Sequence, residues 1–413
     1  MLGPGLITGA SDDDPSGIAT YSQAGAQFGF GLGWTLVLTY PLMVVVQAIS
    51  ARIGRTTGHG IAGNLRLHYP NWLLQSIVAL LFAANTLNIG ADLNAMGAAS
   101  QLLLPSVPAW VFLVIFGGIC IAGQMFLKHT RYVAVLKWLS LSLLSYFAVL
   151  CVVHIDWHAA GRGLLLPKLG ADRDFWMMVV AILGTTISPY LFFWQAAQEV
   201  EDTKARPLRE PLCAKPSQAP GALARIQLDT VVGMGFSNLV ALAIMITAAA
   251  TLHAEGHHDL TSAADAAQAL RPLAGNFAFA LFALGILGTG LLSVPVLAGS
   301  AAYALGEARR WPVGLARKPF QAKAFYGAIA AATVLGGVSS IASVDPVTAL
   351  VWAAIINAIV AVPVMSTLMS MATNRTIMGP FCISRRWAAL GWLATAVMAA
   401  AAVIFLAISI GHR

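Results

Sequence analysis

Long apolar segments follow one another along almost the entire chain. We count eleven of them, at about 2–29, 32–52, 72–99, 107–127, 131–154, 174–199, 226–253, 273–304, 322–342, 347–373 and 386–410. Each is close to, or longer than, the roughly 20 residues that an α-helix needs to cross the hydrocarbon core of a bilayer. The pattern predicts an all-α polytopic membrane protein, a single transmembrane domain over residues 1–413 with about eleven spanning helices.

The composition agrees with a membrane protein. Hydrophobic residues make up 58% of the 413 residues and charged residues only 10%, whereas soluble domains carry about 25% charged residues. A soluble fold would have to bury many helices that are apolar on every face. We therefore expect an integral protein of a lipid bilayer, of the kind found in a bacterial inner (plasma) membrane.

The basic residues are distributed unevenly over the loops. If the N-terminus is cytoplasmic, the cytoplasmic loops carry 19 of the Lys and Arg residues and the opposite side carries 5. This asymmetry follows the positive-inside rule, so it predicts a cytoplasmic N-terminus and an external C-terminus. It also accounts for the net charge of +7 without a nucleic-acid partner. The longest hydrophilic segment, 200–225, contains four prolines and is predicted to be a flexible cytoplasmic linker.

Motifs of soluble catalytic or metal-cofactor proteins are missing from the sequence. The four cysteines lie far apart and form no CxxC pair, so neither a zinc site nor a disulfide framework is expected. The spans contain no HExxH or GxSxG motif and no Ser–His pair of an intramembrane hydrolase. We therefore expect neither an enzyme nor a resident cofactor.

The first span is interrupted by charge. Residues 11–17 read Ser-Asp-Asp-Asp-Pro-Ser-Gly inside an otherwise apolar segment. Each carboxylate at bilayer depth costs about 2.5 kcal/mol or more on insertion scales, and Pro15 and Gly17 interrupt helices. Charge beside a helix break within a hydrophobic span is typical of an ion site in a transporter.

The sixth span has a matching interruption. Residues 184–190 read Gly-Thr-Thr-Ile-Ser-Pro-Tyr, and Pro189 lies about 175 residues after Pro15. If residues 1–154 form a first repeat (helices 1–5) and residues 174–373 a second (helices 6–10), each break lies in the first helix of its half. Five spans is an odd number, so the second repeat inserts upside down, as in inverted-repeat transporters that hold substrate at broken helices. Helix 11, residues 386–410, follows the repeats.

Three motifs carry a family resemblance. Gly3-Pro4-Gly5-Leu6-Ile7, followed by Asp14-Pro15-Ser16-Gly17, resembles the first helix of the Nramp divalent-metal transporters, and Ser188-Pro189-Tyr190 falls at their sixth-helix motif. The resemblance covers all eleven spans and implies a LeuT-like fold of two inverted five-helix repeats, with helices 1 and 6 broken. The family's motifs are Asp-Pro-Gly-Asn and Met-Pro-His. Gly17 therefore replaces Asn, Ser188 replaces Met and Tyr190 replaces His, a pattern similar to the Nramp-related magnesium transporter branch.

The resemblance implies a metal site, and the departures alter its chemistry. Its centre is Asp14, the residue that matches the family's Asp. A thioether selects softer transition metals, and Ser188 supplies an oxygen or only space, so the predicted substrate is Mg²⁺, with Mn²⁺ tolerated, and alternating access moves it. The predicted site residues are Asp14, Ser11, Gly17, Thr185, Ser188, Tyr190, Asp13 and Asn357.

Other polar residues are candidates for the ion pathway. In proton-coupled relatives, an acidic pair in helix 3 belongs to the proton path; here Asp92 matches one member and Ile89 stands near the other. Tyr190 and Gln195 replace histidines and do not titrate near neutral pH. We therefore predict uncoupled import, with Asp12, Asp92, Asn88 and Gln195 along the pathway. Asp12 and Asp13 either attract cations at an aqueous approach to the site or have an N-cap or solvated role at the break. Asp92 either belongs to the proton path or is a hydrogen-bond hub with the nearby Asn residues.

Two other transporter classes remain as alternatives. A proton-coupled Mn²⁺/Fe²⁺ importer of the Nramp type shares the same fold and the same central aspartate. An amino-acid symporter of this fold would bind a substrate carboxylate at the first break, where three aspartates repel it. The sequence therefore favours a divalent cation over an organic anion as the substrate.

Overall fold

The computed structural model describes residues 4–126, 143–260, 262–340 and 345–411, and this part is helical with no strand. The first half comprises α1 (Pro4–Asp12), α2 (Pro15–Phe28), α3 (Gly33–Thr57), α4 (Ile61–His68), α5 (Asn71–Leu103), α6 (Ala109–Phe126), α8 (Leu144–Val152) and α9 (Trp157–Leu165). The second half comprises α10 (Arg173–Thr186), α11 (Pro189–Lys204), α12 (Ala219–Ala248), α13 (Ala263–Ala267), α14 (Arg271–Ala274), α15 (Ala278–Arg309), α16 (Lys323–Ser339), α17 (Pro346–Thr373), α18 (Arg375–Met378) and α19 (Arg385–Gly411).

The long helices agree with the predicted spans. Eight helical segments of the described chain are long and apolar enough to cross a membrane, and one of them, Pro15–Thr57, joins the end of span one to span two. Helix α16 is the ninth span, shorter than the others at 17 residues. Only α8 represents span five, because residues 127–142, including the basic residues Lys128, Arg131 and Lys137, lie outside the described part.

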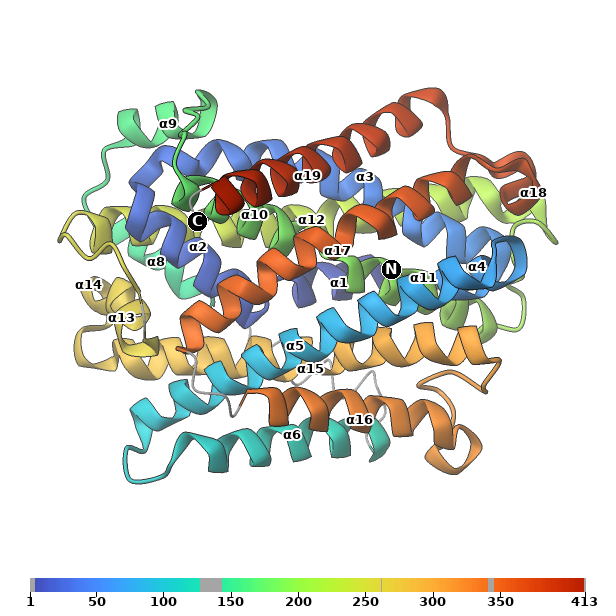
Figure 1. Ribbon diagram of the computed structural model, residues 1–413, viewed down its shortest axis with the longest axis horizontal. Helices are drawn as coiled ribbons and strands as arrows, with labels where there is room; N and C mark the ends of the chain where they lie inside the picture. The colour runs from blue at the N-terminus through green and yellow to red at the C-terminus, as the bar shows by residue number, and fades with distance from the viewer. Residues whose placement is uncertain (1–3, 127–142, 261, 341–344, 412–413) are drawn as a thin grey trace.

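The connecting segments gather at two opposite ends of the bundle (Figure 1). Helices α4 and α18 lie at one end, on the right in Figure 1, together with the segments after α11 and α15. Helices α9, α13 and α14 lie at the other end, and α19 runs toward it. Within the described part of the chain, the basic segments α4 and α18 and those after α11 and α15 therefore share one end.

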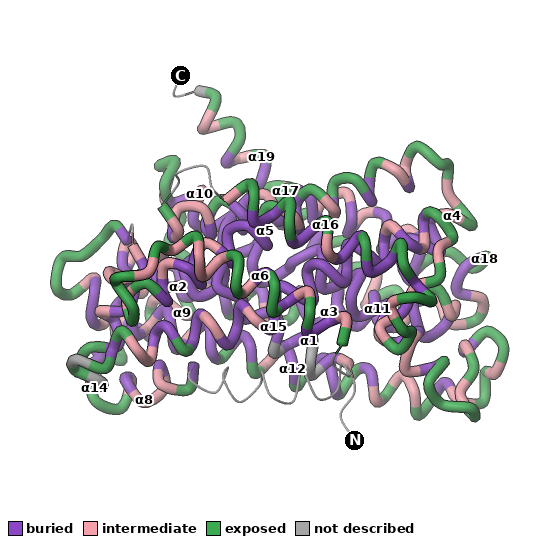
Figure 2. The backbone as a smooth tube through the Cα atoms, turned by 90° about the horizontal axis from the view of Figure 1, so that it is seen from below, coloured by how far each residue is buried: buried purple, intermediate pink, exposed green. Residues whose placement is uncertain are grey.

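The two broken helices occupy the middle of the bundle. Helix α1 points from the basic end toward the centre and α2 continues away from it, whereas α10 and α11 run in the opposite sense. In the most apolar 18 residues of Arg173–Lys204, 89% of the residues are buried, whereas in those of Ala109–Phe126 only 22% are buried. Figure 2 shows the same order, with buried backbone inside and exposed backbone at the periphery. Both breaks are therefore shielded from lipid by other helices, as irregular backbone at membrane depth requires.

Local chemistry explains both breaks. Asp14 is extended (φ −76°, ψ 170°) and its side chain accepts a hydrogen bond from the Gly17 amide, so it caps α2, while Pro15 takes the first helical position. At the second break Ser188 is extended and Pro189 begins α11. The Ser188 hydroxyl lies 2.8 Å from the Gly184 carbonyl oxygen and 3.0 Å from that of Thr185, so it satisfies acceptors at the end of α10.

Glycines allow very close helix contacts around the breaks. A β-carbon on Gly9 of α1 would lie 2.3 Å from the Gly233 carbonyl oxygen of α12. A β-carbon on Gly184 of α10 would lie 1.9 Å from the Ala354 carbonyl oxygen of α17. Small residues at such crossings are typical of membrane helices, which associate by close packing.

The prediction of a flexible linker at 200–225 is wrong. Helix α11 continues to Lys204, and α12 already begins at Ala219. Between them, the Leu212 amide donates to the Arg55 carbonyl oxygen (3.2 Å), and Leu212 is fully buried. The Arg55 guanidinium donates to the Glu210 carbonyl oxygen (2.5 Å) and to Gln218 Oε1 (2.7 Å). These contacts fix the connection against the end of α3.

We expect Gly184→Ala to destabilise the protein, because its methyl group has no space between α10 and α17. Overpacking of this kind costs about 1–3 kcal/mol. The matched control is Gly118→Ala in α6, where a β-carbon meets nothing within 4 Å. Thermal melting in detergent, followed by size-exclusion chromatography, should show a lower midpoint for Gly184→Ala only. Equal midpoints for the two variants would contradict this packing.

Candidate functional site

Asp14 is the centre of a buried polar site between the two breaks. One carboxylate oxygen accepts the Gly17 amide at 2.8 Å. The other lies 3.4 Å from the Asn88 amide nitrogen on α5 and 3.4 Å from the Tyr190 hydroxyl on α11. Asp14 is only 3% exposed. The first break, the second break and α5 therefore meet at this carboxylate.

Further oxygen atoms from both breaks surround it. The Tyr190 hydroxyl donates to the Ser11 carbonyl oxygen at 3.0 Å, which joins the two broken helices directly. A β-carbon on Gly17 would lie 3.2 Å from the Thr185 hydroxyl oxygen and 3.6 Å from the Asp12 carbonyl oxygen. The structure thus brings together Ser11, Gly17, Thr185 and Tyr190 around Asp14, five of the eight residues predicted for the metal site.

Ser188 and Asn357 form no hydrogen bond with Asp14 within the described structure. The Ser188 hydroxyl is turned back onto the carbonyl groups of its own break. Asn357 is 1% exposed on α17, and its side-chain oxygen has no hydrogen-bond partner in the described structure. Helix α17 packs against α10 at Gly184, and its Leu350 carbonyl oxygen accepts the Ser16 hydroxyl at 3.2 Å. Asn357 therefore lies on the helix that flanks both breaks, and no hydrogen bond joins it to Asp14 in the described part.

Asp12 and Asp13 face a different helix. Both approach the hydroxyl oxygen of Ser237 on α12, at 2.7 Å from Asp12 and 3.0 Å from Asp13. They are 2% and 3% exposed, so they do not lie in an aqueous approach in this conformation. The role of either residue in metal binding or in the pathway stays a prediction. Sequence reasoning missed Ser237, because a lone serine in an apolar span carries no signal of its partner.

The remaining pathway candidates separate into two groups. Asp92 lies one turn after Asn88 on α5, accepts the Ser293 hydroxyl at 2.9 Å, and has a second carboxylate oxygen without a hydrogen-bond partner in the described residues. Gln195 is engaged elsewhere, because it donates to Thr230 (3.1 Å) and accepts from Gln47 (2.5 Å). Gln195 therefore links α3, α11 and α12, and its partners are not at the break.

The charge of this region is unbalanced. Asp12, Asp13, Asp14 and Asp92 are all buried, and none forms an ion pair with a basic side chain within the described part of the chain. Buried carboxylates without a countercharge are costly, so the region suits a cation. The described residues contain no cluster of three or more His, Cys, Asp or Glu side chains arranged for a metal. A cation at Asp14 would therefore complete its shell with carbonyl, hydroxyl and water oxygens.

Comparison with known proteins decides the family. The family model described as natural resistance-associated macrophage protein-like (Nramp) matches residues 5–408. The chain belongs to the Nramp family. Curated Nramp relatives include the divalent metal cation transporter MntH of Yersinia enterocolitica, 27% identical over 320 residues that cover 72% of this chain and 70% of the relative. MntH of Yersinia pestis is 28% identical over 314 residues, with the same coverage.

Solved structures agree with this fold. The Eremococcus coleocola manganese transporter, in complex with an aromatic bis-isothiourea substituted compound, has a TM-score of 0.78 at 16% identity, over 98% of this chain and 85% of that one. MHP1, a nucleobase-cation-symport-1 family transporter in a closed conformation, has a TM-score of 0.58 at 14% identity, over 99% and 91%. The predicted all-α, LeuT-like architecture is confirmed, and this Nramp-family protein is a membrane transporter rather than an enzyme.

We expect Tyr190→Phe to weaken divalent-cation binding about tenfold, because residues that orient a metal ligand typically contribute 10–100-fold in affinity. The variant removes the bond to the Ser11 carbonyl oxygen and the contact with Asp14. Tyr40→Phe is the matched control, since it removes a hydroxyl that donates to the Val231 carbonyl oxygen (3.2 Å) between other helices. Calorimetric titration with Mn²⁺ checks the expectation, and equal affinities in the two variants would refute it.

Proposed function

We propose that this Nramp-family protein imports divalent metal cations through the Asp14 site, with Mg²⁺ as its main substrate and Mn²⁺ also carried. The observation that carries the proposal is the donor set. Asp14, the Ser11 and Asp12 carbonyl groups, Thr185 and Tyr190 offer only oxygen around the break. Magnesium prefers a carboxylate with oxygen neighbours and retained water, whereas a thioether favours softer metals.

Space and polarity at the second break support the same substrate. Ser188 is small and its hydroxyl is occupied by the Gly184 and Thr185 carbonyl oxygens. Gly17 leaves room beside the Thr185 hydroxyl, which a β-carbon at this position would approach to 3.2 Å. Both features favour an ion that keeps part of its hydration shell, because Mg²⁺ dehydrates reluctantly.

We infer that import is not coupled to protons. Tyr190 and Gln195 stand where histidines are expected, and Gln195 is held in hydrogen bonds to Gln47 and Thr230. The ion gradient and the membrane potential then drive uptake, and the potential supplies about 4.6 kcal/mol per 100 mV for a divalent ion. The basic end of the bundle, with α4 and α18, would be cytoplasmic in a bacterial plasma membrane, and α19 would end outside.

One observation favours the second candidate, a proton-coupled Mn²⁺/Fe²⁺ importer. Asp92 is fully buried on α5, one turn from Asn88, with one carboxylate oxygen unpartnered in the described structure. Such a carboxylate suits a proton carrier. The names of the relatives, a divalent metal cation transporter and a manganese transporter, are compatible with this candidate as well.

We expect liposomes that contain the protein to take up Mg²⁺ and, more slowly, Mn²⁺, without internal acidification. Asp14→Ala should abolish uptake of both ions, because it removes the carboxylate that contacts residues of both breaks. Fluorescent indicators for the metal and for internal pH measure both quantities together. Mn²⁺ uptake with acidification that depends on Asp92, and no Mg²⁺ flux, would instead establish the proton-coupled importer.

We expect Ser188→Met to gain Cd²⁺ uptake and lose Mg²⁺ uptake, because the thioether adds a soft ligand and fills the space for water. Ser188→Ala is the control, since it keeps the space without adding sulfur. Uptake of ¹⁰⁹Cd²⁺ and of Mg²⁺ in the same liposomes measures the change. Wild-type Cd²⁺ uptake as fast as that of Ser188→Met would contradict a hard-cation site.

A further inference from the structure

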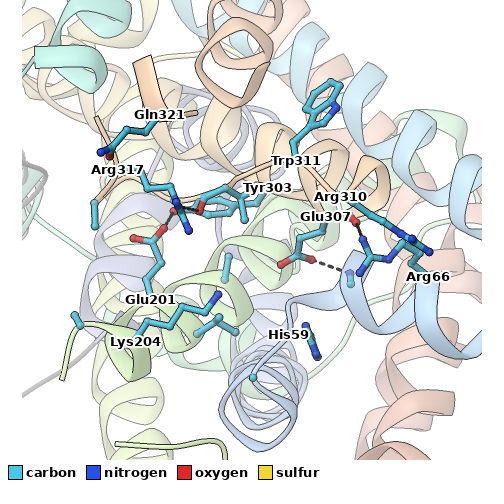
Figure 3. Close-up of a pocket in the computed structure, with 18 residues that line it drawn as sticks. His59, Arg66, Glu201, Lys204, Tyr303, Glu307, Arg310, Trp311, Arg317 and Gln321 are labelled. Atoms are coloured by element: carbon cyan, nitrogen blue, oxygen red, sulfur yellow. Dashed lines mark hydrogen bonds between the residues drawn. The ribbon is translucent and has the colours of Figure 1, made fainter. Parts of the chain in front are cut away.

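A second polar cavity lies at the basic end of the bundle. Its volume is about 550 Å³, within the range of small-molecule sites. It lies between the turn joining α3 to α4, the end of α11, the end of α15 and the segment 311–321 (Figure 3). Helix α11 begins at Pro189, beside the Asp14 site, and lines the cavity from Ala197 to Lys204, about 12 to 22 Å further along at 1.5 Å per residue. The cavity is therefore separate from the transport site.

Basic side chains dominate the lining. Arg66, Lys204, Arg310 and Arg317 line the cavity together with His59. Among the described residues, Lys204 and Arg310 make no hydrogen bond through their side chains and no ion pair. In Figure 3 the Lys204 side chain extends from α11 into the space between the two acidic residues of the lining. Lys204 thus lies near the charges of Glu201 and Glu307 but forms no ion pair with either within the described structure.

Both carboxylates of the lining are already used by the backbone. Glu307 accepts the Gly60 amide at 3.0 Å and the Gly63 amide at 2.8 Å. Glu201 accepts the Leu315 amide at 2.9 Å and the Tyr303 hydroxyl. These bonds hold the α3–α4 turn and the segment after α15 in place. Because these carboxylates already accept hydrogen bonds from the protein, the basic side chains are the groups that could bind a ligand. The cavity therefore suits an anion better than a metal cation.

Two further observations concern the positive charge of the cavity and the backbone conformation of Arg310. Burial lowers the pKa of His59, and the nearby charges of Lys204, Arg66 and His68 lower it further. Arg310 ends α15 with φ +60° and is the only non-glycine residue of the described chain with a positive φ. Glycine is favoured at such a helix end, so an arginine there carries a backbone cost, as is common for residues at binding sites.

We propose that this cavity binds a phosphate-bearing anion of about nucleotide size, with Lys204 and Arg310 as its principal phosphate ligands. Arginine forms bidentate bonds to phosphate and lysine acts as a compact point charge. Trp311 and Gln321 line the same cavity and supply a flat apolar face and a polar amide. A bound phosphate would bridge α11 to α15. The phosphate could belong to a soluble nucleotide or to an anionic phospholipid headgroup, and the two sources share this chemistry.

The test measures binding, so it does not depend on which ion the transporter carries. Purified full-length protein is titrated calorimetrically with ATP, with EDTA present so that no metal reaches the Asp14 site. We expect saturable binding that weakens by about tenfold or more in Lys204→Gln/Arg310→Gln, because two charge-assisted hydrogen bonds are lost. The matched control is Lys323→Gln/Arg385→Gln, which removes two exposed basic residues outside the cavity. The single variant Lys204→Gln replaces the double variant if the latter is not monodisperse.

A lipid source gives a different result. The wild type would then fail to bind ATP, but would melt at a higher temperature in nanodiscs of phosphatidylglycerol than in nanodiscs of phosphatidylcholine. The cavity variant alone would lose that difference. The proposal is overturned if ATP binds the wild type and both double variants equally. It is also overturned if ATP does not bind and phosphatidylglycerol gives no increase in melting temperature. The same holds if that increase is equal in the wild type, the cavity variant and the control variant.

Discussion

The hydrogen bond from the Gly17 amide to the Asp14 carboxylate is the interaction on which the central site depends. A helix that stops inside a membrane leaves backbone amides without acceptors, and lipid cannot satisfy them. Asp14 supplies one oxygen for this purpose and keeps the other toward α5 and α11. One residue thus caps the helix that follows the break and also places a carboxylate in the middle of the bundle. The second break is different: the Ser188 hydroxyl donates to carbonyl oxygens at the end of α10 and makes no hydrogen bond that caps α11, and it adds no charge.

The short helix α1 is attached mainly through one neighbour, α12. The Gly5 amide donates to Asp229 (2.8 Å), Gly9 contacts Gly233, and Asp12 and Asp13 share Ser237. Asp229 lies 3.9 Å from Arg225, which pairs with Glu199 of α11 at 2.5 Å. Helix α1, nine residues long, is therefore tied by a few specific bonds rather than by a long packed face. The break between Asp12 and Pro15 separates it from α2.

Much of this architecture could be predicted from the order of apolar spans and from two prolines. Pro15 and Pro189 marked both breaks because polar residues accompany them; proline disfavours a continuing helix, but Pro41, Pro295 and Pro363 lie within continuous helices. Asp14, Ser11 and Tyr190 were assigned to one site through the resemblance to the Nramp motifs, and the structure brings these three residues together. The turn of Asp12 and Asp13 toward Ser237 could not be predicted, because it depends on which face of α1 meets α12. The packed segment 205–218 was also misjudged, since its hydrogen bonds to α3 come from residues distant in the sequence.

The four buried aspartates also connect the cargo to the stability of the protein. Asp12, Asp13, Asp14 and Asp92 repel one another at low dielectric, and no basic side chain of the described structure relieves them. A cation that binds only the folded state contributes RT ln(1 + [L]/Kd), or about 2.7 kcal/mol at 100 times its Kd. If the transported ion binds at Asp14 as proposed, it also stabilises the folded protein. Chelators used in purification would remove that contribution, and the empty carrier would be the least stable species of its own transport cycle.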